Sequence, residues 1–346
     1  MPVRPLPHED LEHILINTSS LWNEAKGKSF FITGGTGFFG FWLLESFVYI
    51  NDRLELGMSA CVLTRDVQKF KFRAPHLANR LDLNFVEGDI RTFKYPEGDF
   101  NYVIHAATET NAKYNKDYPQ DVLDTIIGGT KHVLEFCQKA SVCKILITSS
   151  GAVYGPQPFN ITKIPEEYLR SINPDLHDMP YAYGKRVAED MAILDSKNRN
   201  YEVKIARCFA FVGPHLPIDG HFAIGNFIRD AISNKDIQIQ GDGSPFRSYL
   251  YASDLAIWLW TILFAGRNNC PYNVGSDHSL DIAELADLVL KSLEKKSIIN
   301  IAKQRKTGAI ATRYVPDISR AKQELKLEVK IPLSFAISKT ALWYSD

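Results

Sequence analysis

A short run of glycines near the start of the chain constrains its fold more than any other feature. Residues 33–40 read Thr-Gly-Gly-Thr-Gly-Phe-Phe-Gly and lie between two apolar runs. An apolar strand, a glycine turn and an amphipathic helix in this order are typical of a dinucleotide-binding βα unit. Gly34 permits the tight turn, Gly37 lets the backbone approach a pyrophosphate, and Gly40 lets the helix pack on the strand. The sequence therefore predicts phosphate binding at the helix N-terminus, where backbone N–H groups lack intrahelical partners.

Apolar runs alternate with helical patterns along the first 207 residues. Strands are expected at 29–33, 59–64, 83–87, 102–107, 144–148 and 202–207, and helices at 11–26, 38–50, 117–140 and 181–198. This alternation favours right-handed βαβ units in a Rossmann-type, doubly wound parallel α/β sheet. We divide the chain into an N-terminal helical extension (1–27), an NAD(P)-binding domain (28–207) and a smaller α/β substrate lobe (208–346), with some elements interleaved.

The overall composition excludes several functional classes. Lys plus Arg and Asp plus Glu both number 40 in the 346 residues, so the formal net charge is zero. A neutral balance provides no general field to recruit nucleic acid or an anionic membrane surface. No apolar run approaches the roughly 20 residues that span a bilayer, and the N-terminus shows no signal-peptide pattern. Five cysteines without metal-ligand spacing indicate free thiols. We expect a cytoplasmic protein without a nucleic-acid, membrane or metal partner.

A tyrosine and a lysine four residues apart lie at the start of the helix expected at 181–198. Tyr181 and Lys185 would share one helix face, one turn apart. A nearby ammonium favours the phenolate, which suits a tyrosine to exchange a proton with an alcohol or ketone. An aromatic side chain beside a solvated lysine is the alternative interpretation of the pair.

A hydroxyl at the end of the fifth expected strand completes this arrangement. Residues 148–155 read Thr-Ser-Ser-Gly-Ala-Val-Tyr-Gly, which places Ser150 at the sheet edge. Ser150 could hydrogen-bond the substrate oxygen that Tyr181 protonates, although a loop serine often bonds its own backbone. The glycine turn, Ser150 and the Tyr–Lys pair together describe a hydride-transfer site.

These motifs resemble the extended short-chain dehydrogenase/reductase family, and more narrowly its nucleotide-sugar epimerase/dehydratase branch. The resemblance rests on Gly34-x-x-Gly37-x-x-Gly40, Gly88-Asp89, His105-Ala106-Ala107, Ser150, Tyr181-x-x-x-Lys185, and the segments 247–254, 272–275 and 316–322. It covers the chain from about residue 28 to the C-terminus. Such collinear agreement is specific for the family and less specific for one reaction.

The resemblance implies roles for individual residues. Ser150, Tyr181 and Lys185 would be the catalytic triad, with Tyr181 as the acid or base. Arg247 would grip the diphosphate of a sugar nucleotide, a task suited to a guanidinium fork, although a surface arginine is the alternative. Asn226, Ser150 and Tyr181 would complete the substrate site. The cofactor would be bound by Gly34, Gly37, Phe38, Phe39, Gly40, Thr64, Arg65, Asp89, Ile90, Ala106, Ala107, Thr108, Tyr181 and Lys185, with Asp89 and Ile90 at the adenine.

Two positions after the hydroxyl residue depart from part of the family. Members that eliminate water from the hexose carry an Asp-Glu pair there. This chain has Gly151 and Ala152, which cannot perform acid or base chemistry. Dehydration of that type is therefore disfavoured.

The expected substrate pocket also carries unusual residues. Ile126 and Ala210 replace asparagines that the family commonly carries, which favours a pocket unlike that of the common galactose epimerases. His215 and His221 lie in a loop near this pocket. We favour histidines that face solvent or substrate hydroxyls, and an additional base is the alternative.

The residues that follow the second expected strand bear on the choice of cofactor. An acidic residue there would bind both ribose hydroxyls and favour NAD. The chain has Thr64, Arg65 and Asp66 at this place. Arg65 could pair with a 2′-phosphate, whereas Asp66 could still reach the ribose. We expect NAD(P), with NADP slightly favoured.

The motifs predict an enzyme that transfers a hydride at a sugar carbon, C4, of a nucleotide-diphosphate sugar. It would be an epimerase or a 4-keto-sugar reductase. A decarboxylase or dehydratase of the same family is the alternative, because a 4-keto intermediate labilises the carboxyl group of a uronic acid. A non-catalytic dinucleotide-sensing scaffold is a different class, which the presence of Tyr181 and Lys185 disfavours. The resemblance also implies a homodimer formed through a four-helix bundle by the helices near 117–140 and 181–198.

Overall fold

The chain divides into two compact units. The computed structural model describes residues 2–108, 112–168, 179–197, 199–220, 222–306 and 308–345. Unit 1 comprises 1–153, 172–207 and 256–272, and unit 2 comprises 154–171, 208–255 and 273–346. Relative to the division expected from the sequence, 154–171 and 256–272 change sides, and the N-terminal extension is part of unit 1. No helix within the described ranges is both long and apolar enough to cross a membrane.

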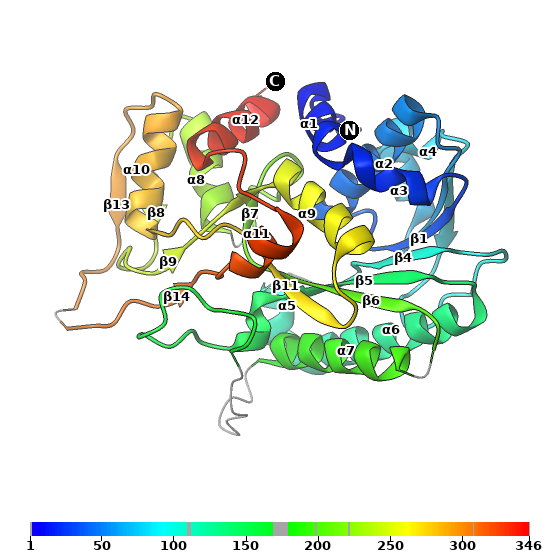
Figure 1. The fold of residues 1–346 in the computed structure, drawn as a ribbon. Helices are drawn as coiled ribbons and strands as arrows, with labels where there is room; N and C mark the ends of the chain where they lie inside the picture. The colour runs from blue at the N-terminus through cyan, green and yellow to red at the C-terminus, as the bar shows by residue number, and fades with distance from the viewer. Residues whose placement is uncertain are drawn as a thin grey trace. The chain divides into compact units, whose positions relative to one another are not determined.

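A seven-stranded parallel sheet forms the centre of unit 1 (Figure 1), with the order β11-β6-β5-β4-β1-β2-β3. Its strands are β1 (Ser29–Thr33), β2 (Ser59–Thr64), β3 (Leu83–Glu87), β4 (Tyr102–His105), β5 (Lys144–Ser150), β6 (Glu202–Cys208) and β11 (Cys270–Val274). The predicted Rossmann-type α/β class is confirmed. The strand order changes direction between β1 and β4, and ligands of open α/β sheets bind at such a switch point.

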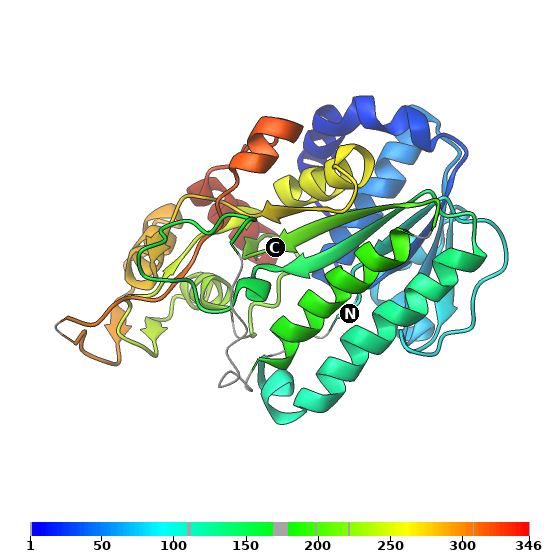
Figure 2. The same ribbon diagram turned by 60° about the horizontal axis from the view of Figure 1, so that its bottom comes forward.

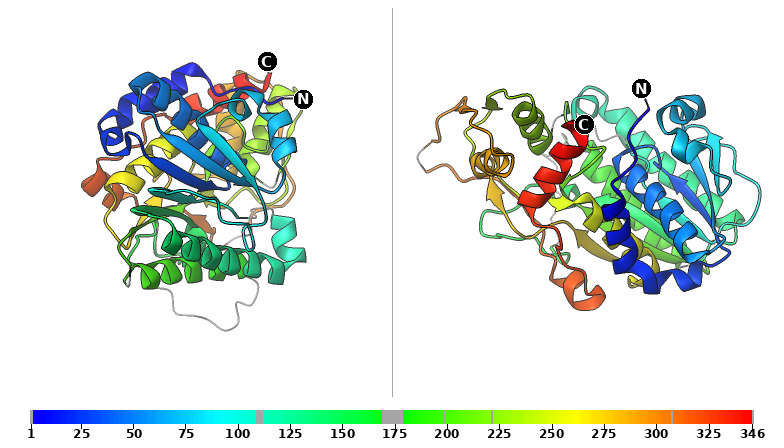
Figure 3. Two further views of the ribbon diagram at one scale, coloured as in Figure 1. Left: turned by 90° about the vertical axis from the view of Figure 1, so that its right-hand side faces the viewer. Right: turned by 90° about the horizontal axis from the view of Figure 1, so that it is seen from above.

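Helices cover both faces of this sheet, as Figures 2 and 3 show. On one face lie α6 (Pro119–Lys139) and α7 (Pro180–Ser196). On the other face lie α1 (His8–Thr18), the 3₁₀ helix η1 (Ser19–Ala25), α2 (Phe38–Leu54), α3 (Val67–Arg73), α4 (Pro75–Ala78) and the second half of α9 (Ala252–Ala265). The sheet is therefore the middle of three layers, and both of its faces are apolar.

Two predicted elements needed correction. The helix expected at 117–140 is α6, and it starts at Pro119 because a proline disfavours helical backbone at the preceding Tyr118; a short helix that was not predicted, α5 (Ala112–Asp117), precedes it. The strand expected at 102–107 ends at His105, since the N–H of Ala107 donates to the Thr33 side chain instead of a ladder carbonyl. β11 was not predicted as a strand.

Alternating side chains of β1 anchor the two apolar layers. Phe30 packs edge-on against Phe47 and Trp260, with ring centroids 5.1 and 6.2 Å away. Phe31 faces the opposite side and lies 4.6 Å from the ring centroid of Phe136 on α6. Both phenylalanines are fully buried. Burial of each contributes about 1.5–3 kcal/mol, so the strand that precedes the glycine turn is held from both faces.

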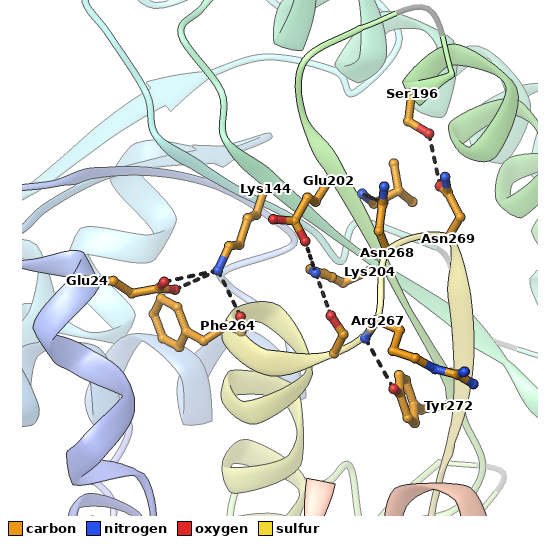
Figure 4. A network of polar contacts seen from close by, with 12 residues as sticks. Glu24, Lys144, Ser196, Glu202, Lys204, Phe264, Arg267, Asn268, Asn269 and Tyr272 are labelled. Carbon is orange, nitrogen blue, oxygen red and sulfur yellow. Dashed lines mark hydrogen bonds and ion pairs between the residues drawn. The ribbon is translucent and has the colours of Figure 1, made fainter. Parts of the chain in front are cut away.

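Lysines at the start of β5 and β6 hold the end of α9 (Figure 4). The ammonium of Lys144 donates to the carbonyl of Phe264 at 2.8 Å, and that of Lys204 donates to the carbonyl of Gly266. The last carbonyls of a helix lack intrahelical partners, and a cation there also complements the helix dipole. These contacts attach the second half of α9 to the amino edge of the sheet.

Amide and hydroxyl side chains complete this edge (Figure 4). The Asn268 side chain accepts a hydrogen bond from the N–H of Val203 at 2.8 Å. The backbone N–H of Asn269 donates to the carbonyl of Val203 at 2.8 Å, and its side chain accepts from Ser196 at 2.9 Å. The segment 256–272 thus joins unit 1 through its backbone as well as through apolar packing.

Unit 2 consists of small sheets and helices. The 3₁₀ helix η2 (Gly151–Tyr154) ends the first segment of unit 1. The described elements of unit 2 are β7 (Phe211–Val212), α8 (Ala223–Ile232), β8 (Ile237–Ile239), β9 (Phe246–Arg247), β10 (Leu250–Tyr251), β12 (Leu280–Asp281), α10 (Ile282–Ser292), β13 (Ile299–Ile301), β14 (Arg313–Tyr314), α11 (Ser319–Leu325) and α12 (Leu333–Ser345). α8, α10 and α12 pack against one another. Asp281 begins α10 with a capping box to Glu284, a local signal that stabilises the helix start.

Candidate active site

The glycine turn between β1 and α2 is built from close backbone contacts. Gly34 has φ +74°, and a Cβ there would lie 2.5 Å from the backbone of Ala106. A Cβ on Gly40 would lie 2.2 Å from the backbone of Gly35. Among the residues that the structure describes, a Cβ on Gly37 would meet only the carbonyl oxygen of Gly34, at 3.6 Å. The space in front of the α2 N-terminus is therefore open, as phosphate binding to its N–H groups requires.

A buried histidine fixes the end of β4 beside this turn. The two ring nitrogens of His105 hydrogen-bond the hydroxyls of Thr33 at 2.9 Å and Thr130 at 3.1 Å. Thr33 also accepts the N–H of Ala107 at 3.2 Å. Burial, with a smaller contribution from the Lys185 charge, lowers the pKa of His105 to about 3. His105 is thus a neutral bridge that sets the path of Ala106 and Ala107.

Thr108 follows these two alanines and carries a buried hydroxyl. Its Oγ1 is buried and has no hydrogen-bond partner among the residues that the structure describes. Buried hydroxyls are nearly always hydrogen-bonded in folded proteins. An unsatisfied oxygen next to the glycine turn fits a bound group that supplies the missing partner.

The residues expected at the adenine follow β3. Arg91 holds the Asp89 carboxylate through its backbone N–H at 2.9 Å and its Nε at 2.8 Å. These hydrogen bonds to Arg91 are the largest cause of a lowered Asp89 pKa. Ile90 is 8% exposed and packs close to Gly129 of α6, where a Cβ would approach within 2.9 Å. Arg91, which sequence reasoning missed, thus orients the expected adenine residue.

The end of β2 lies next to the glycine turn and to β3. Thr33 pairs with Leu63, and Thr64 pairs with Glu87, so these segments leave the sheet at one edge. Arg65 and Asp66 are exposed. The Asp66 carboxylate accepts the N–H of Lys69 at 2.7 Å and forms the N-cap of α3.

The expected catalytic residues come from β5 and α7. Lys185 is 5% exposed, donates to the carbonyl of Thr148 at 2.8 Å, and lies 5.9 Å from the Tyr181 ring centroid. Tyr181 packs against an apolar cluster of Val122, Ile126 and Ala188. The hydroxyl of Ser150 accepts the N–H of Ala152 at 3.1 Å. Because Lys185 bonds the strand two residues before Ser150, the inner face of α7 is fixed to the end of β5.

A buried ion pair that sequence reasoning missed strengthens this attachment. Glu189 of α7 pairs with Arg207 of β6 at 2.6 Å, and the two residues are 1% and 4% exposed. Ser149 also donates to the Glu189 carboxylate. Glu189 follows Tyr181 and Lys185 at four-residue steps and therefore lies on the same helix face, which packs inward. A charged residue on that face was the sequence feature that could have predicted the ion pair. The pair locks α7 against β5 and β6.

The glycine turn, Ser150 and the Tyr–Lys pair lie together in unit 1. The family model of the NAD dependent epimerase/dehydratase family matches residues 30–275, which include all of them. The chain belongs to this family. The resemblance to the epimerase/dehydratase branch of the extended short-chain dehydrogenase/reductases is confirmed.

Two plant relatives are similar to most of the chain. UDP-glucuronic acid decarboxylase 3 of Arabidopsis thaliana is 30% identical over 309 residues, which cover 87% of this chain and 84% of the relative. UDP-glucuronic acid decarboxylase 1 of the same organism is 28% identical over 302 residues. The match to the latter covers 87% of this chain and 66% of the relative, just under two thirds of its length.

A solved structure shows the same fold. It is a mutant UDP-glucuronic acid 4-epimerase from Bacillus cereus in complex with UDP-4-deoxy-4-fluoro-glucuronic acid and NAD. Its TM-score is 0.76 at 20% identity, covering 91% of this chain and 98% of that chain. At this identity the likeness concerns the fold alone.

The expected substrate residues Arg247 and Asn226 belong to unit 2. Arg247 is half-buried and donates to the carbonyl of Phe246 at 2.7 Å. Asn226 of α8 accepts from Arg229 at 3.3 Å and lines a polar hollow of about 440 Å³. The roles of Arg247 and Asn226 toward a substrate stay predictions.

The two loop histidines, His215 and His221, were considered near the substrate pocket. His215 is 7% exposed and packs on Trp343, with ring centroids 4.7 Å apart, so it does not face solvent, and its contact with a substrate stays a prediction. Its backbone has φ +68°, which is uncommon for a residue other than glycine. His221 lies outside the described residues.

Proposed function

We propose that this chain moves a hydride at C4 of a nucleotide-diphosphate sugar, as an epimerase or a 4-keto-sugar reductase. The observation that carries the proposal is the placement of Tyr181, Lys185 and Ser150 at the carboxyl edge of the sheet that bears the glycine turn. Family membership supports the use of a nicotinamide dinucleotide.

The three side chains suit proton exchange at a carbon that bears a hydroxyl or ketone. The Lys185 ammonium, one helical turn from Tyr181, favours a phenolate that accepts the proton of the substrate hydroxyl. Ser150 would donate or accept a hydrogen bond at the same oxygen and orient it. When bound, the nicotinamide takes up or returns the hydride. The return of the proton by Tyr181 completes an epimerisation or a reduction.

The residues present fit such a cofactor. The N–H groups at the start of α2, with Phe38, Phe39 and Gly40, would hold the pyrophosphate. Asp89 and Ile90 would hold the adenine, and Lys185 and Tyr181 the nicotinamide ribose. The unsatisfied Thr108 hydroxyl and the backbone of Ala106 and Ala107 would line its path.

NADP is the form that the β2 end favours. Arg65 is exposed and lies near enough to Asp89 to contribute to its lowered pKa. Asp66, which could have bound the ribose hydroxyls, caps α3. A guanidinium at this place suits a 2′-phosphate.

Decarboxylation of a nucleotide-activated uronic acid is the second candidate, because the plant relatives bear that name. Oxidation at C4 would labilise the carboxyl group, after which an acid must protonate C5. Gly151 and Ala152 follow Ser150 and offer no proton, which places this reaction second. The same two residues disfavour dehydration.

A homodimer is consistent with an apolar stripe on α7. Tyr183, Val187 and Leu194 are 36%, 38% and 60% exposed. Large apolar side chains that recur on one helix face suit a helix of a second copy. We propose a four-helix interface formed by α6 and α7 of two protomers, which sedimentation of the purified chain tests.

Tyr181→Phe tests the proposed function. The phenylalanine keeps the packing on the apolar cluster of Val122, Ile126 and Ala188 and removes the proton-transferring hydroxyl. We expect turnover of UDP-sugars or their 4-keto forms to fall by about 10²–10⁴-fold, with dinucleotide affinity falling far less, because Lys185 still holds the nicotinamide ribose. Product analysis by mass spectrometry and NMR distinguishes an epimer, a reduced sugar and a pentose formed with CO₂. Unchanged turnover in the variant would sink the proposal, and a pentose would select the second candidate.

A further inference from the structure

Two carboxylates near the expected adenosine ribose accept backbone N–H groups in the first turn of α3. Asp66 accepts the N–H of Lys69 at 2.7 Å, and Glu87 accepts the N–H of Val67 at 3.0 Å. A carboxylate that binds the ribose diol would have to give up such a bond. The local fold thus uses its acidic groups to hold a helix N-terminus.

The same short helix returns an arginine to the glycine turn. Arg73 is the last residue of α3, and its Nη1 lies 3.5 Å from the carbonyl oxygen of Thr36. Its Cζ lies 5.0 Å from the ring centroid of Phe41, in the first turn of α2. A guanidinium over an aromatic ring is held with less loss of rotamer freedom when it later binds an anion.

The N-terminal segment fixes the backbone of this arginine. The N–H of Val3 donates to the carbonyl of Arg73 at 2.7 Å. Leu6 donates to the Glu45 carboxylate at 2.7 Å, and His76 of α4 contacts the same carboxylate at 3.2 Å. Glu45 is only 3% exposed. The backbone of Arg73 is therefore tied down, while its side chain is exposed beside the turn.

We propose that Arg73 acts with Arg65 to bind the 2′-phosphate of NADP(H) and to select it over NAD(H). Arg65 directly follows the end of β2, and Arg73 contacts Thr36 of the glycine turn, which leaves the sheet beside β2. Each guanidinium offers a fork that matches phosphate oxygens. The inference rests on the proposed function, since it takes the glycine turn as the dinucleotide site.

Binding of adenosine phosphates tests this role without catalysis. Calorimetric titration with adenosine 2′,5′-bisphosphate and 5′-AMP isolates the 2′-phosphate, and NADP⁺ and NAD⁺ extend the comparison. In Arg73→Ala we expect affinity for the bisphosphate and NADP⁺ to fall about tenfold, equal to about 1.4 kcal/mol. Affinity for 5′-AMP and NAD⁺ should change less than about twofold. Arg73→Lys should lie between, because an ammonium lacks the planar fork.

Lys71→Ala is the matched control, since Lys71 is an exposed cation on the same helix. It should leave the affinity for the bisphosphate within about twofold, and thermal unfolding should show all variants folded. If Lys71→Ala lost as much affinity for the bisphosphate as Arg73→Ala, the loss would reflect the positive charge of the surface in general, and the proposal would be overturned. So would an Arg73→Ala variant that loses all four ligands equally or none.

Different experiments test the role of Arg73 and the proposed reaction. A wild-type chain that binds NAD⁺ in preference, with Arg73→Ala unchanged, would overturn the role of Arg73 while Tyr181-dependent turnover stood. Unchanged turnover in Tyr181→Phe would overturn the reaction, and the adenosine phosphate titrations would still report on Arg73.

Discussion

The two edges of the parallel sheet in unit 1 each hold a buried lysine, and their surroundings differ. At the carboxyl edge, Lys185 is 5% exposed and donates to a strand carbonyl, with its Nζ 5.9 Å from the Tyr181 ring centroid. At the amino edge, Lys204 is 1% exposed, donates to the carbonyl of Gly266 and pairs with Glu202. Burial alone therefore does not mark a catalytic lysine. We expect the neighbour of each ammonium to decide its role, which is a phenol at one edge and a helix end at the other.

The remaining residues of the two edges show the same contrast. The carboxyl edge carries glycines, short hydroxyls and alanines, such as Gly37, Thr108 and Ser150, which leave room for a ligand. At the amino edge, long polar side chains hydrogen-bond one another and the backbone (Figure 4). We infer that the polar groups at the carboxyl edge bind a ligand and that those at the amino edge stabilise the fold.

Replacement of each lysine by methionine gives the largest test of this contrast. In Lys185→Met, turnover should fall by about 10²–10⁴-fold, because the phenolate of Tyr181 loses its nearby positive charge. In Lys204→Met, turnover per folded molecule should be unchanged. The free energy of unfolding should fall by about 1–3 kcal/mol, since the buried Gly266 carbonyl loses its donor. Urea unfolding and steady-state kinetics on both variants measure the two effects.

The comparison breaks if the two lysines exchange phenotypes. Loss of turnover in folded Lys204→Met would mean that the amino edge contributes to the chemistry. A Lys185→Met variant with full turnover would mean that Tyr181 works without the ammonium, and the lysine would be structural like Lys204.

His105 sharpens the comparison through pH. Its pKa in the folded chain is about 3, below the value of about 6.5 for an unfolded chain. Between these values the unfolded chain binds a proton that the folded chain does not, so stability falls as pH falls from about 6.5 toward 3. From pH 7 to pH 5 the loss from this residue should be about 2 kcal/mol.

His105→Gln isolates that contribution, because the amide can still bond the hydroxyls of Thr33 and Thr130 and does not titrate. Urea unfolding of both proteins at pH 7 and pH 5 gives the difference. The wild type should lose about 2 kcal/mol more than the variant over this interval. If wild type and variant instead lost the same free energy of unfolding between pH 7 and pH 5, His105 would titrate alike in the folded and unfolded chains. That result would contradict a buried, neutral His105.

The carboxyl edge was largely predictable from the sequence, because its geometry follows from local pattern. A strand, a glycine turn and a helix place Gly34, Gly37 and Gly40. The four-residue step between Tyr181 and Lys185 places both on one helix face. Parallel pairing then brings the strand ends to one edge, and the structure finds the strands within two residues of their expected bounds.

The amino edge was not predictable, because its contacts join residues far apart in the chain. Lys204 and Gly266 are 62 residues apart, and Lys144 and Phe264 are 120 apart. A lysine within an apolar strand gives no local sign of its partner. β11 was missed for a related reason: its first residues have mixed character, and its place beside β6 depends on α9. Arg73 was not predicted for the same reason, because it contacts Thr36, 37 residues away in the sequence, only in the folded chain.

Two serines with equal burial give the finest test. Ser150 at the carboxyl edge and Ser196 at the amino edge are both 7% exposed. Ser150→Ala should lower turnover by about tenfold, equivalent to about 1.4 kcal/mol in the barrier, and change stability by less than about 0.5 kcal/mol. Ser196→Ala removes the donor to Asn269 and should lower the free energy of unfolding by about 1 kcal/mol with turnover unchanged.

Because both changes delete one hydroxyl from a buried serine, differences in size, charge and exposure cancel between them. Steady-state kinetics and urea unfolding on the two variants therefore compare position alone. If both serines affected stability equally and neither affected turnover, Ser150 would be a loop residue bonding its own backbone at Ala152. The division between a ligand-facing edge and a fold-holding edge would then rest on the lysines alone. If instead turnover responds only at Ser150, the hydroxyl that accepts from Ala152 also serves the substrate oxygen, and the carboxyl edge acts as one site.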